Sequence, residues 1–336
     1  MKFLITGIAG GIGSTLGHQL YTQGHSIVGI DNFQNGYLDN LVINNQYYCD
    51  FYRADIKDTH QLIEIFKKTK PDVIIHLAAT TALPVCENDP TAAIMNNVGG
   101  TNSLLEAARM SDIGTVIFAS TSAIYENTDP ILAPFKESAP INPRLIYPLS
   151  KKLGEELCVS FEQNYGMTVP RLRFFNVFGP RQDVHRTSPP LINYLVREFA
   201  NNRAPVLHST GLQVRDYIHV NDVTSLINLV AENPRKDSTI NVSSGKLMSV
   251  RAIVDNVRLA LDSSIEPVYQ DSEKYWDSYT NLFAGAYKLD KSVIAKEVNK
   301  FALGDNSQAK EEYNWNPNTD LESLIQQTAQ QIKDTL

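Results

Sequence analysis

The chain has 336 residues, of which 20% are charged, and carries a formal net charge of -7. This length exceeds what one hydrophobic core usually supports, so we expect a large α/β body and a smaller second lobe. The acidic balance argues against an extended cationic surface, so neither nucleic acid nor an anionic membrane is an expected partner.

The start of the chain and its cysteines favour a cytoplasmic location. The first seven residues run directly into a glycine-containing turn, too early for a signal peptide, and no apolar run approaches the length of a membrane span. Cys49, Cys86 and Cys158 form no C-x-x-C pair, and no histidine cluster has ligand spacing. We therefore expect neither a metal site nor a disulfide framework.

The first half of the chain alternates short β-branched runs with stretches of helical periodicity, which is typical of βαβ units. Such nearly continuous apolar strands indicate burial on both faces. We therefore predict a Rossmann-type, doubly wound parallel sheet whose ligands lie at the carboxyl ends of the strands. The expected strands are 2–6, 26–31, 47–52, 73–77, 115–120 and 172–176, with helices after residue 11 and over 60–68, 92–110 and 147–164.

The pattern becomes irregular and rich in proline after Asn176. A helix is predicted over 191–201, and the segments 218–220, 223–230 and 240–242 resemble a return to the sheet. Helices over 249–261 and 321–333 are assigned to the second lobe. The expected division is a dinucleotide-binding domain over 1–176, to which 214–245 partly returns, and a smaller α/β substrate-binding lobe formed by 177–213 and 246–336.

A glycine-rich turn joins the first predicted strand to its helix. Gly7, Gly10 and Gly13 are spaced three apart, and Gly11 adds further freedom. Without Cβ atoms, backbone N–H groups can approach a pyrophosphate at the helix N-terminus. Asp31 ends the second strand, where a carboxylate accepts hydrogen bonds from a ribose 2′-hydroxyl and repels a 2′-phosphate. The pair predicts NAD rather than NADP as the cofactor.

Other strand ends supply further candidate cofactor contacts. Asp55 follows the third strand and is placed to meet the adenine amino group, although a turn or cap role is an alternative. Ala78 and Ala79 allow a close approach to the backbone, or simply pack in the core. Asn97 is a ligand contact or a helix cap. The predicted set is completed by Ile12, Asn32, Ile56, Leu77, Ser120, Tyr147 and Lys151.

A tyrosine and a lysine lie four residues apart at the start of a predicted helix, so their side chains share one face. We expect the Lys151 cation to lower the pKa of Tyr147, which makes the phenol a plausible acid or base for a sugar hydroxyl. Taken alone, such a pair is common on surfaces. Thr121, at the end of the fifth strand, strengthens the prediction because its hydroxyl would face the same cleft.

Seven motifs together resemble the nucleotide-sugar epimerase and dehydratase branch of the extended short-chain dehydrogenases/reductases. They lie over residues 1 to 245: Thr6-Gly7-x-x-Gly10-x-x-Gly13, Asp31-Asn32, Leu77-Ala78-Ala79, Asn97-x-x-Gly100-Thr101, Tyr147-x-x-x-Lys151, Phe175 to Pro180, and Arg215 to Val220. The resemblance implies that Thr121, Tyr147 and Lys151 carry the redox step, and that Asn176 and Arg215 contact the diphosphate region, with Ser122 also at the substrate. It further implies an NAD-dependent enzyme that works as a homodimer through its helices near 92–110 and 147–164.

Two residues beside Thr121 bear on which reaction follows oxidation at C4. Dehydratases of this branch have Asp-Glu after that threonine, and UDP-glucuronate decarboxylases have a glutamate where Ala123 stands; this chain has Ser122-Ala123. A 4-epimerase needs no additional acid or base. We therefore expect a nucleotide-sugar 4-epimerase, with a dehydratase or a UDP-glucuronate decarboxylase as alternatives. A non-catalytic NAD-binding scaffold or sensor is the alternative of another class.

Four further side chains have local interpretations. A planar guanidinium at Arg215 suits two phosphate oxygens, with a surface pair to Asp216 as the alternative. His185 and Arg186 are expected to be exposed to solvent rather than to contact an acidic or N-acetylated sugar. His219 is expected to order its own loop.

Overall fold

Seven parallel strands form the central sheet of the chain. The computed structural model describes residues 1–125, 133–186 and 188–336. Across the sheet the strand order is β12-β8-β7-β6-β1-β2-β5, so the order reverses between β1 and β6. The strands are β1 (Lys2–Thr6), β2 (Ser26–Asp31), β5 (Asp50–Arg53), β6 (Val73–His76), β7 (Val116–Thr121), β8 (Arg171–Phe174) and β12 (Thr239–Val242). The predicted Rossmann-type sheet is confirmed.

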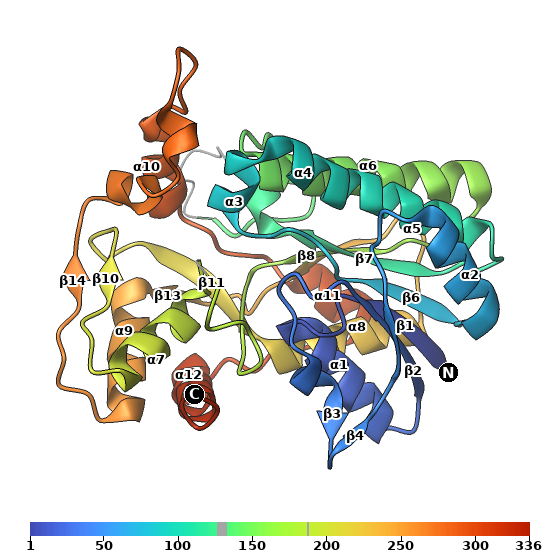
Figure 1. Cartoon of the computed structure of the whole chain (residues 1–336), viewed down its shortest axis with the longest axis horizontal. Helices are drawn as coiled ribbons and strands as arrows, with labels where there is room; N and C mark the ends of the chain where they lie inside the picture. The colour runs from blue at the N-terminus through green and yellow to red at the C-terminus, as the bar shows by residue number, and fades with distance from the viewer. Residues whose placement is uncertain (126–132, 187) are drawn as a thin grey trace.

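Helices cover both faces of this sheet because successive strand residues point to opposite sides. Phe3 and Ile5 pack on one face against Leu16, whereas Leu4 lies in a separate core on the other face with Leu62. Figure 1 shows the two helical layers above and below the sheet. One layer contains α1 (Gly11–Thr22), α8 (Val220–Glu232) and α11 (Ser307–Tyr313), and the other contains α2 (Thr59–Thr69), α5 (Gly100–Arg109) and α6 (Ile146–Tyr165).

The long helix expected over 92–110 is interrupted. It consists of α4 (Pro90–Ile94), a π-helical turn over Met95–Gly99 and α5, and it is preceded by a short helix that the sequence did not suggest, α3 (Leu83–Asn88). A π-helical turn inserts an extra residue into the helical ladder, and such turns are frequent at functional sites. Asn97 therefore lies inside this turn rather than capping a helix.

A second lobe packs around its own core. Ile192, Leu195, Ile253 and Ile325 are buried together there. Its helices are α7 (Leu191–Ala200), α9 (Val250–Leu261) and α12 (Leu321–Lys333), and its short strands are β10 (Val206–Leu207), β13 (Leu247–Ser249) and β14 (Val268–Tyr269). Helix α10 (Lys291–Asn299) packs instead in a small separate core, where Ile294 lies with Leu145 and Trp276. In Figure 1 this lobe lies beside the carboxyl ends of the main strands. Between β2 and β5, the strands β3 (Val42–Ile43) and β4 (Gln46–Tyr47) form a small antiparallel hairpin.

Two details of the chain path correct the sequence-based expectation. The segment around Ile218 does not return to the main sheet: β11 (Val214–His219) pairs with β9 (Asn176–Phe178) and β13 in a three-stranded sheet. The reason is that β9, which follows β8 after one residue, leaves the main sheet and offers β11 a parallel partner, with Tyr217 opposite Asn176. Conversely, Ala309 and Trp315 pack in the core of the main sheet, although the sequence assigned that region to the second lobe.

Candidate active site

The glycine turn lies at the point where the strand order reverses. Gly7 has φ of +71°, and a Cβ added to it would lie 3.0 Å from the backbone nitrogen of Ala78, at the end of the neighbouring strand β6. A Cβ on Gly13 would lie 2.2 Å from the Gly7 carbonyl oxygen. The first strand, its helix and the loop after β6 can therefore approach this closely only without side chains at these two positions.

Asp31 closes the far side of the same turn. Its carboxylate is 9% exposed and accepts hydrogen bonds from the Ala9 amide at 3.0 Å and the Phe33 amide at 2.8 Å. Burial raises the pKa of this carboxyl above its ordinary value, and the backbone donors oppose that effect. The two amides leave part of the lone-pair capacity of the carboxylate oxygens for a ribose hydroxyl.

A cavity opens between the glycine turn and the ends of β2, β5 and β6. Eight of the residues predicted to contact the cofactor line it: Gly7, Gly10, Asp31, Asn32, Ile56, Leu77, Ala78 and Ala79. The structure adds lining residues that the sequence reasoning missed, namely Ile30, Gln34, Asn35, Gly36, Ala54 and Asn96. Gly36 lies close to the glycine turn, since a Cβ there would lie 2.7 Å from the Ala9 side chain.

Other predicted cofactor residues lie just behind this lining. Gly11, Ile12 and Gly13 form the first turn of α1. The Asp55 carboxylate bonds the backbone and the ammonium group of Lys57, and these contacts hold its pKa below the ordinary value although burial acts the other way. The exposed charge pair makes Asp55 partly a turn residue, as its alternative interpretation expected.

Asn97 is buried and fully engaged by the protein. Its amide oxygen accepts from the Thr80 amide at 2.8 Å, and its amide nitrogen donates to the Thr80 carbonyl and to the Ser150 hydroxyl, both at 2.9 Å. It therefore fastens the loop after β6 to helix α6. Its neighbour Asn96 is the residue that faces the cavity.

The residues around the cavity fit a dinucleotide. Gly7 and Gly10 line the cavity, and the nearby N-terminus of α1 has no side-chain cap, so its free backbone amides suit a pyrophosphate. At the other end Asp31 offers an anionic acceptor, and Asn32 and Gln34 are at hand beside it. These groups would hold NAD, with the ribose at Asp31.

Two of the three predicted catalytic residues meet at the carboxyl end of β7, and the third follows one helical turn later in α6. Thr121 ends that strand, and its hydroxyl is hydrogen-bonded to the Tyr147 phenol in the first turn of α6. Lys151 follows one helical turn later, is 4% exposed, and has its ammonium nitrogen 4.4 Å from the centre of the Phe118 ring. The chain thus places a hydroxyl against a phenol at the end of β7 and buries an amine against the same strand.

The expected effect of Lys151 on the phenol is not found in this structure. Burial raises the pKa of Tyr147 to about 12; the Thr121 hydrogen bond lowers it, and the buried thiol of Cys86 raises it further. Burial likewise lowers the pKa of Lys151 to about 8, against the influence of Cys158 and Glu155. The reason is that both groups are desolvated, and desolvation favours the neutral form of each.

Helix α6 is fixed at its start by a residue that sequence reasoning missed. The Glu87 carboxylate in α3 accepts a hydrogen bond from the backbone amide of Ile146, the first residue of α6. A negative charge is favourable at a helix N-terminus, where backbone amides lack partners. Glu87 therefore holds the segment that carries Tyr147, although nothing in the local sequence pattern of 83–88 predicts this contact.

The two serines beside Thr121 lie in different surroundings. Ser120 is buried and donates to Glu155 at 2.5 Å, so its hydroxyl is directed into the protein between β7 and α6. Ser122 is half-buried in the short 3₁₀ helix Ser122–Tyr125 that follows the strand. Whether either meets a ligand stays a prediction.

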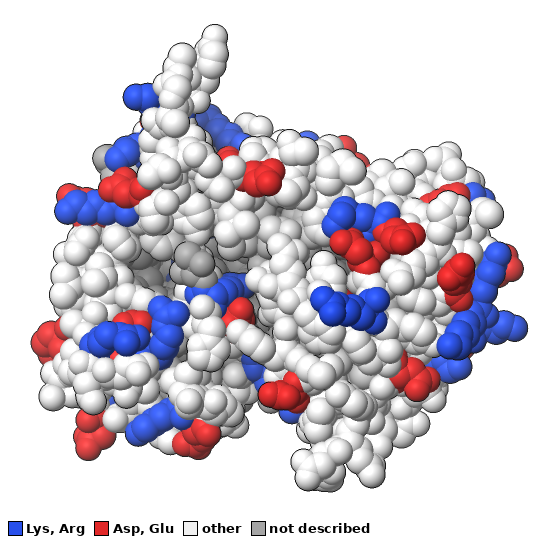
Figure 2. Space-filling view, in the orientation of Figure 1, with Lys and Arg blue, Asp and Glu red and all other residues white. Residues whose placement is uncertain are grey.

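A larger cavity, of about 680 Å³, lies between the two lobes. Figure 2 shows the surface hollowed there, with Lys and Arg atoms inside the hollow. Asn176 and Arg215 both line it. Arg215 donates from Nη2 to the carbonyl oxygens of Glu297 at 2.7 Å and Val298 at 3.0 Å, whereas its buried Nε atom has no partner. A buried donor without a partner suits a ligand oxygen at this position.

The same cavity contains residues that the sequence did not assign. The expectation that Arg186 is exposed is wrong: it is half-buried and lines the cavity, because its Nε donates to the Ser188 carbonyl and turns the side chain inward. His185 is exposed as expected. His208 and Trp276 also line it, each with a buried nitrogen that has no partner. Their distance along the chain explains why no motif revealed them.

The remaining findings concern His219, metal ligands and membrane spans. His219 accepts from the Asn221 amide at 3.3 Å and caps α8, which confirms that it orders its own loop. Over residues 1–125, 133–186 and 188–336, no three His, Cys, Asp or Glu side chains are placed to hold a metal ion. Within those ranges no helix combines the length and apolar character that a membrane crossing requires.

Comparison with known proteins identifies the family. Residues 4–328 match the family described as GDP-mannose 4,6 dehydratase. A putative UDP-glucose 4-epimerase from Methanocaldococcus jannaschii is 33% identical over 267 residues, which cover 79% of this chain and 84% of that protein.

Two solved structures are similar over the whole chain. The UDP-glucose 4-epimerase of Thermotoga maritima, solved with UDP-glucose, has a TM-score of 0.86 and 26% identity, covering 100% of this chain and 99% of that one. The UDP-N-acetylglucosamine 4-epimerase of Methanobrevibacter ruminantium, in complex with UDP-N-acetylmuramic acid, has a TM-score of 0.85 and 28% identity, covering 100% and 99%. With the site described above, these matches show that the chain belongs to the GDP-mannose 4,6 dehydratase family of extended short-chain dehydrogenases/reductases, whose members are NAD-dependent sugar epimerases and dehydratases.

Proposed function

We propose that the protein is an NAD-dependent nucleotide-sugar 4-epimerase. The observation that carries the proposal is that the Thr121 hydroxyl at the end of β7 is hydrogen-bonded to the Tyr147 phenol, while the adjacent Ser122 and Ala123 supply no further acid or base. Lys151 follows Tyr147 one helical turn later in α6. Elimination or decarboxylation would require additional catalytic groups, whereas inversion at C4 requires one group that takes and returns a proton. The names of the similar UDP-sugar 4-epimerases support the same reaction.

The residues of the chain have separate tasks in this reaction. Bound NAD would accept hydride from C4 of the sugar and return it to the opposite face. Tyr147 removes the proton from the 4-hydroxyl and gives it back, and Thr121 donates a hydrogen bond that stabilises the phenol oxygen while it carries negative charge. Lys151, when protonated, favours that charged form from one helical turn away.

The large cavity between the lobes is the proposed site of the nucleotide diphosphate. Arg215 has an unpartnered Nε there, and Asn176, which bonds the Asp216 carbonyl at 2.8 Å, is held at the same wall. A guanidinium matches phosphate oxygens well. Turning of the keto sugar before hydride returns requires space, which this cavity provides at about 680 Å³.

The proposal has alternatives, and further predictions accompany it. A dehydratase or a UDP-glucuronate decarboxylase remains the alternative within the family, and an NAD-binding scaffold or sensor the alternative outside catalysis. The homodimer through the helices near 92–110 and 147–164 and the cytoplasmic location stay predictions. The domain division at residues 176, 213 and 245 is likewise a proposal, except that Ala309 and Trp315 pack with the main sheet.

A substrate panel tests the reaction. Purified protein is incubated with NAD and with UDP-, GDP-, CDP- and dTDP-linked hexoses and hexuronates, and the products are identified by NMR. A new C4 epimer that is absent with Tyr147→Phe supports the proposal. A 4-keto-6-deoxy product or released carbon dioxide would replace it by one of the family alternatives. No turnover of any sugar, with NAD bound, would favour the scaffold.

A further inference from the structure

Helix α6 is joined to strand β8 by two buried ion pairs. Glu155 pairs with Arg173, whose Nε and Nη2 atoms lie 2.9 Å and 2.8 Å from its carboxylate oxygens, and Glu162 pairs with Arg171 at 2.5 Å. All four side chains are less than 10% exposed. Because buried charges are costly to desolvate, two such pairs side by side invite the question of what each does.

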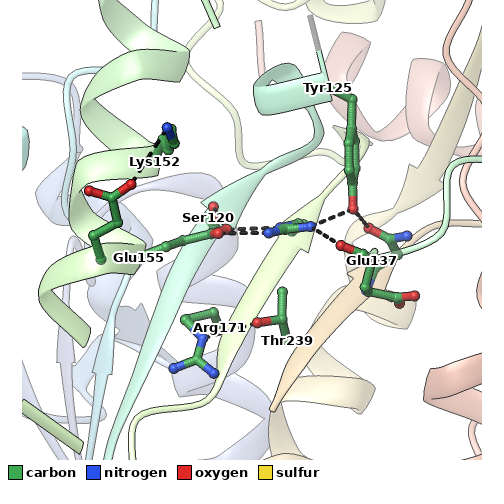
Figure 3. Close-up of polar contacts among 10 residues, drawn as sticks. Ser120, Tyr125, Glu137, Lys152, Glu155, Arg171 and Thr239 are labelled. Atoms are coloured by element: carbon green, nitrogen blue, oxygen red, sulfur yellow. Dashed lines mark hydrogen bonds and ion pairs between the residues drawn. The ribbon is translucent and has the colours of Figure 1, made fainter. Parts of the chain in front are cut away.

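Only the Glu155–Arg173 pair lies next to the predicted catalytic residues. Glu155 lies one helical turn beyond Lys151, and its Oε1 accepts from Ser120, the neighbour of Thr121 on β7, at 2.5 Å. Figure 3 shows Ser120 and Glu155 directed toward each other between strand and helix. Glu162, two turns further along, instead accepts from the Val169 amide at 2.8 Å.

The Arg173 side chain is itself held from the opposite side. Its Nη1 atom donates to the Tyr125 hydroxyl and to the Glu137 carbonyl oxygen, both at 2.8 Å. The Tyr125 hydroxyl in turn donates to Asn241 at 2.8 Å (Figure 3). The Arg173 guanidinium is thus held from two sides, and it in turn holds the Glu155 carboxylate in place.

Titratable groups face Lys151 from several elements. Glu155 and the Cys158 thiol face it from α6, and His76 faces it from β6. Arg173 on β8 acts through the carboxylate of Glu155. Of the groups named here, Glu155 supplies the carboxylate. Without it, the Lys151 and Arg173 cations would lie in one buried region with no anion between them.

We propose that Glu155 is a positioning residue for catalysis: its carboxylate, fixed by Arg173 and Ser120, holds Lys151 in its charged state one turn from Tyr147. The inference rests on the proposed function for the role of Lys151 in turnover. The electrostatic relation itself concerns side chains of this chain alone, and is measurable without turnover.

The relation predicts opposite effects for the two members of the ion pair. In Glu155→Gln, Lys151 loses an anion and gives up its proton more readily, so its titration moves to lower pH. In Arg173→Gln, Glu155 is left with Lys151 as its remaining cation, so the titration of Lys151 moves to higher pH. A neighbouring charge shifts such a titration by about one pH unit or more. A merely structural role would give both variants the same sign.

Two matched variants separate charge from packing. Glu162→Gln breaks the equivalent pair on the same helix and strand, and leaves the titration of Lys151 where it is in the wild type. Glu155→Asp retains the charge with a shorter side chain, and keeps most of the wild-type titration even if the protein is less stable. The melting temperature of each variant is recorded by circular dichroism.

The experiment is trace acetylation of the purified full-length protein with acetic anhydride across pH 6 to 11, with the label on the Lys151 peptide quantified by mass spectrometry. Opposite shifts for Glu155→Gln and Arg173→Gln, with Glu162→Gln unchanged, support the proposal. Equal titration of Lys151 in all variants, or shifts of the same sign, overturns it. If Glu155→Gln does not fold, an unmoved or lowered titration in Arg173→Gln is sufficient to reject it.

Activity assays then distinguish this proposal from the proposed function. With an accepted nucleotide sugar, the alkaline limb of kcat moves with the titration of Lys151 in each variant, while KM changes little. If acetylation shows the shifts but no sugar is turned over, the proposed function fails and the electrostatic role of Glu155 stands. If epimerisation occurs and the shifts are absent, the proposed function stands and the electrostatic role of Glu155 fails.

Discussion

The carboxylate of Asp31 accepts a hydrogen bond from the backbone amide of Ala9, with 3.0 Å between nitrogen and oxygen. This contact joins the end of β2 to the glycine turn after β1. The carboxylate that is predicted to bind the ribose therefore also fixes the turn that is predicted to bind the pyrophosphate. Both parts of the cofactor site depend on one charged group.

Asp31→Asn keeps the shape of the side chain and removes its charge. We expect the affinity for NAD to fall at least about tenfold, since hydrogen bonds to charged groups contribute about 1.5–3 kcal/mol. We also expect weaker discrimination against NADP, because the repulsion of a 2′-phosphate is lost. Isothermal titration calorimetry with both dinucleotides measures this, with the exposed Asp39→Asn as control. An unchanged ratio of the two affinities would contradict the assignment.

Tyr147→Phe removes the phenol oxygen while leaving the ring in place. We expect binding of NAD and nucleotide sugar to persist while kcat falls at least about a hundredfold, the scale of acid–base assistance. Tyr165→Phe, at the exposed end of the same helix, should retain full activity. Steady-state kinetics on the accepted sugar provides the comparison, and equal kcat values for wild type and Tyr147→Phe would remove Tyr147 from the mechanism.

Without the dinucleotide, the Tyr147 phenol should stay protonated through neutral and mildly alkaline pH. Burial raises its pKa to about 12, so the phenolate forms only as the pH approaches that value. Ultraviolet difference titration near 295 nm should therefore give the same curve for wild type and Tyr147→Phe between pH 7 and 10. A tyrosinate signal that is lost in the variant within this range would show that the phenol is already activated in the protein alone.

His76 makes the stability of the fold sensitive to acid. Its Nδ1 lies 2.8 Å from the Thr6 hydroxyl and its Nε2 lies 3.1 Å from the Thr101 hydroxyl, which donates to the Asn97 carbonyl. The donation by Thr101 makes Nε2 the proton-bearing nitrogen and Nδ1 an acceptor. Burial, reinforced by the charge of Lys151, lowers the pKa of His76 from 6.5 to about 3.

The sign follows from the lowered pKa. The unfolded chain binds the proton more tightly than the folded one, so the contribution of His76 is complete above pH 6.5 and is lost as the pH falls toward 3. The loss is about 1.4 kcal/mol per pH unit in this window. Urea unfolding of wild type and His76→Gln between pH 4 and 7.5 should show a smaller pH dependence in the variant. The exposed His60→Gln should match the wild type; a variant slope equal to the wild-type slope would contradict this.

Arg215→Lys tests the proposed diphosphate site. Lysine keeps the positive charge but cannot present a planar pair of donors, so we expect KM for the accepted nucleotide sugar to rise about tenfold or more. The affinity for NAD should not change, because Arg215 lines the cavity between the lobes and not the one beside the glycine turn. The control is Arg203→Lys, an exposed residue just after the end of α7. An increase in the Kd of NAD that matches the rise in KM would indicate a general loss of structure.

The sequence was sufficient where local spacing determines geometry. Gly7, Gly10 and Asp31 lie in one strand–turn–helix–strand unit, so their mutual placement follows from the unit itself, and all three line the predicted cavity. Thr121 ends a strand and Tyr147 lies at the start of a helix that meets the same sheet edge, which is why their sharing one cleft could be anticipated; the hydrogen bond between them was not. The family motifs, being contiguous, were found for the same reason.

Long-range packing decided the rest. Arg186, His208 and Trp276 share a cavity only because the second lobe folds against the sheet, and no local pattern connects them. The partner of β11 depended on β9 leaving the main sheet, a competition between strands that periodicity does not reveal. The charge states of Tyr147 and Lys151 were expected from their spacing, yet desolvation by the surrounding fold outweighs it. The sequence alone thus determined the groups that lie close along the chain, because their spacing fixes how one unit folds. The tertiary structure alone determined which distant residues meet and how buried and how charged they are, because packing and burial are properties of the whole fold.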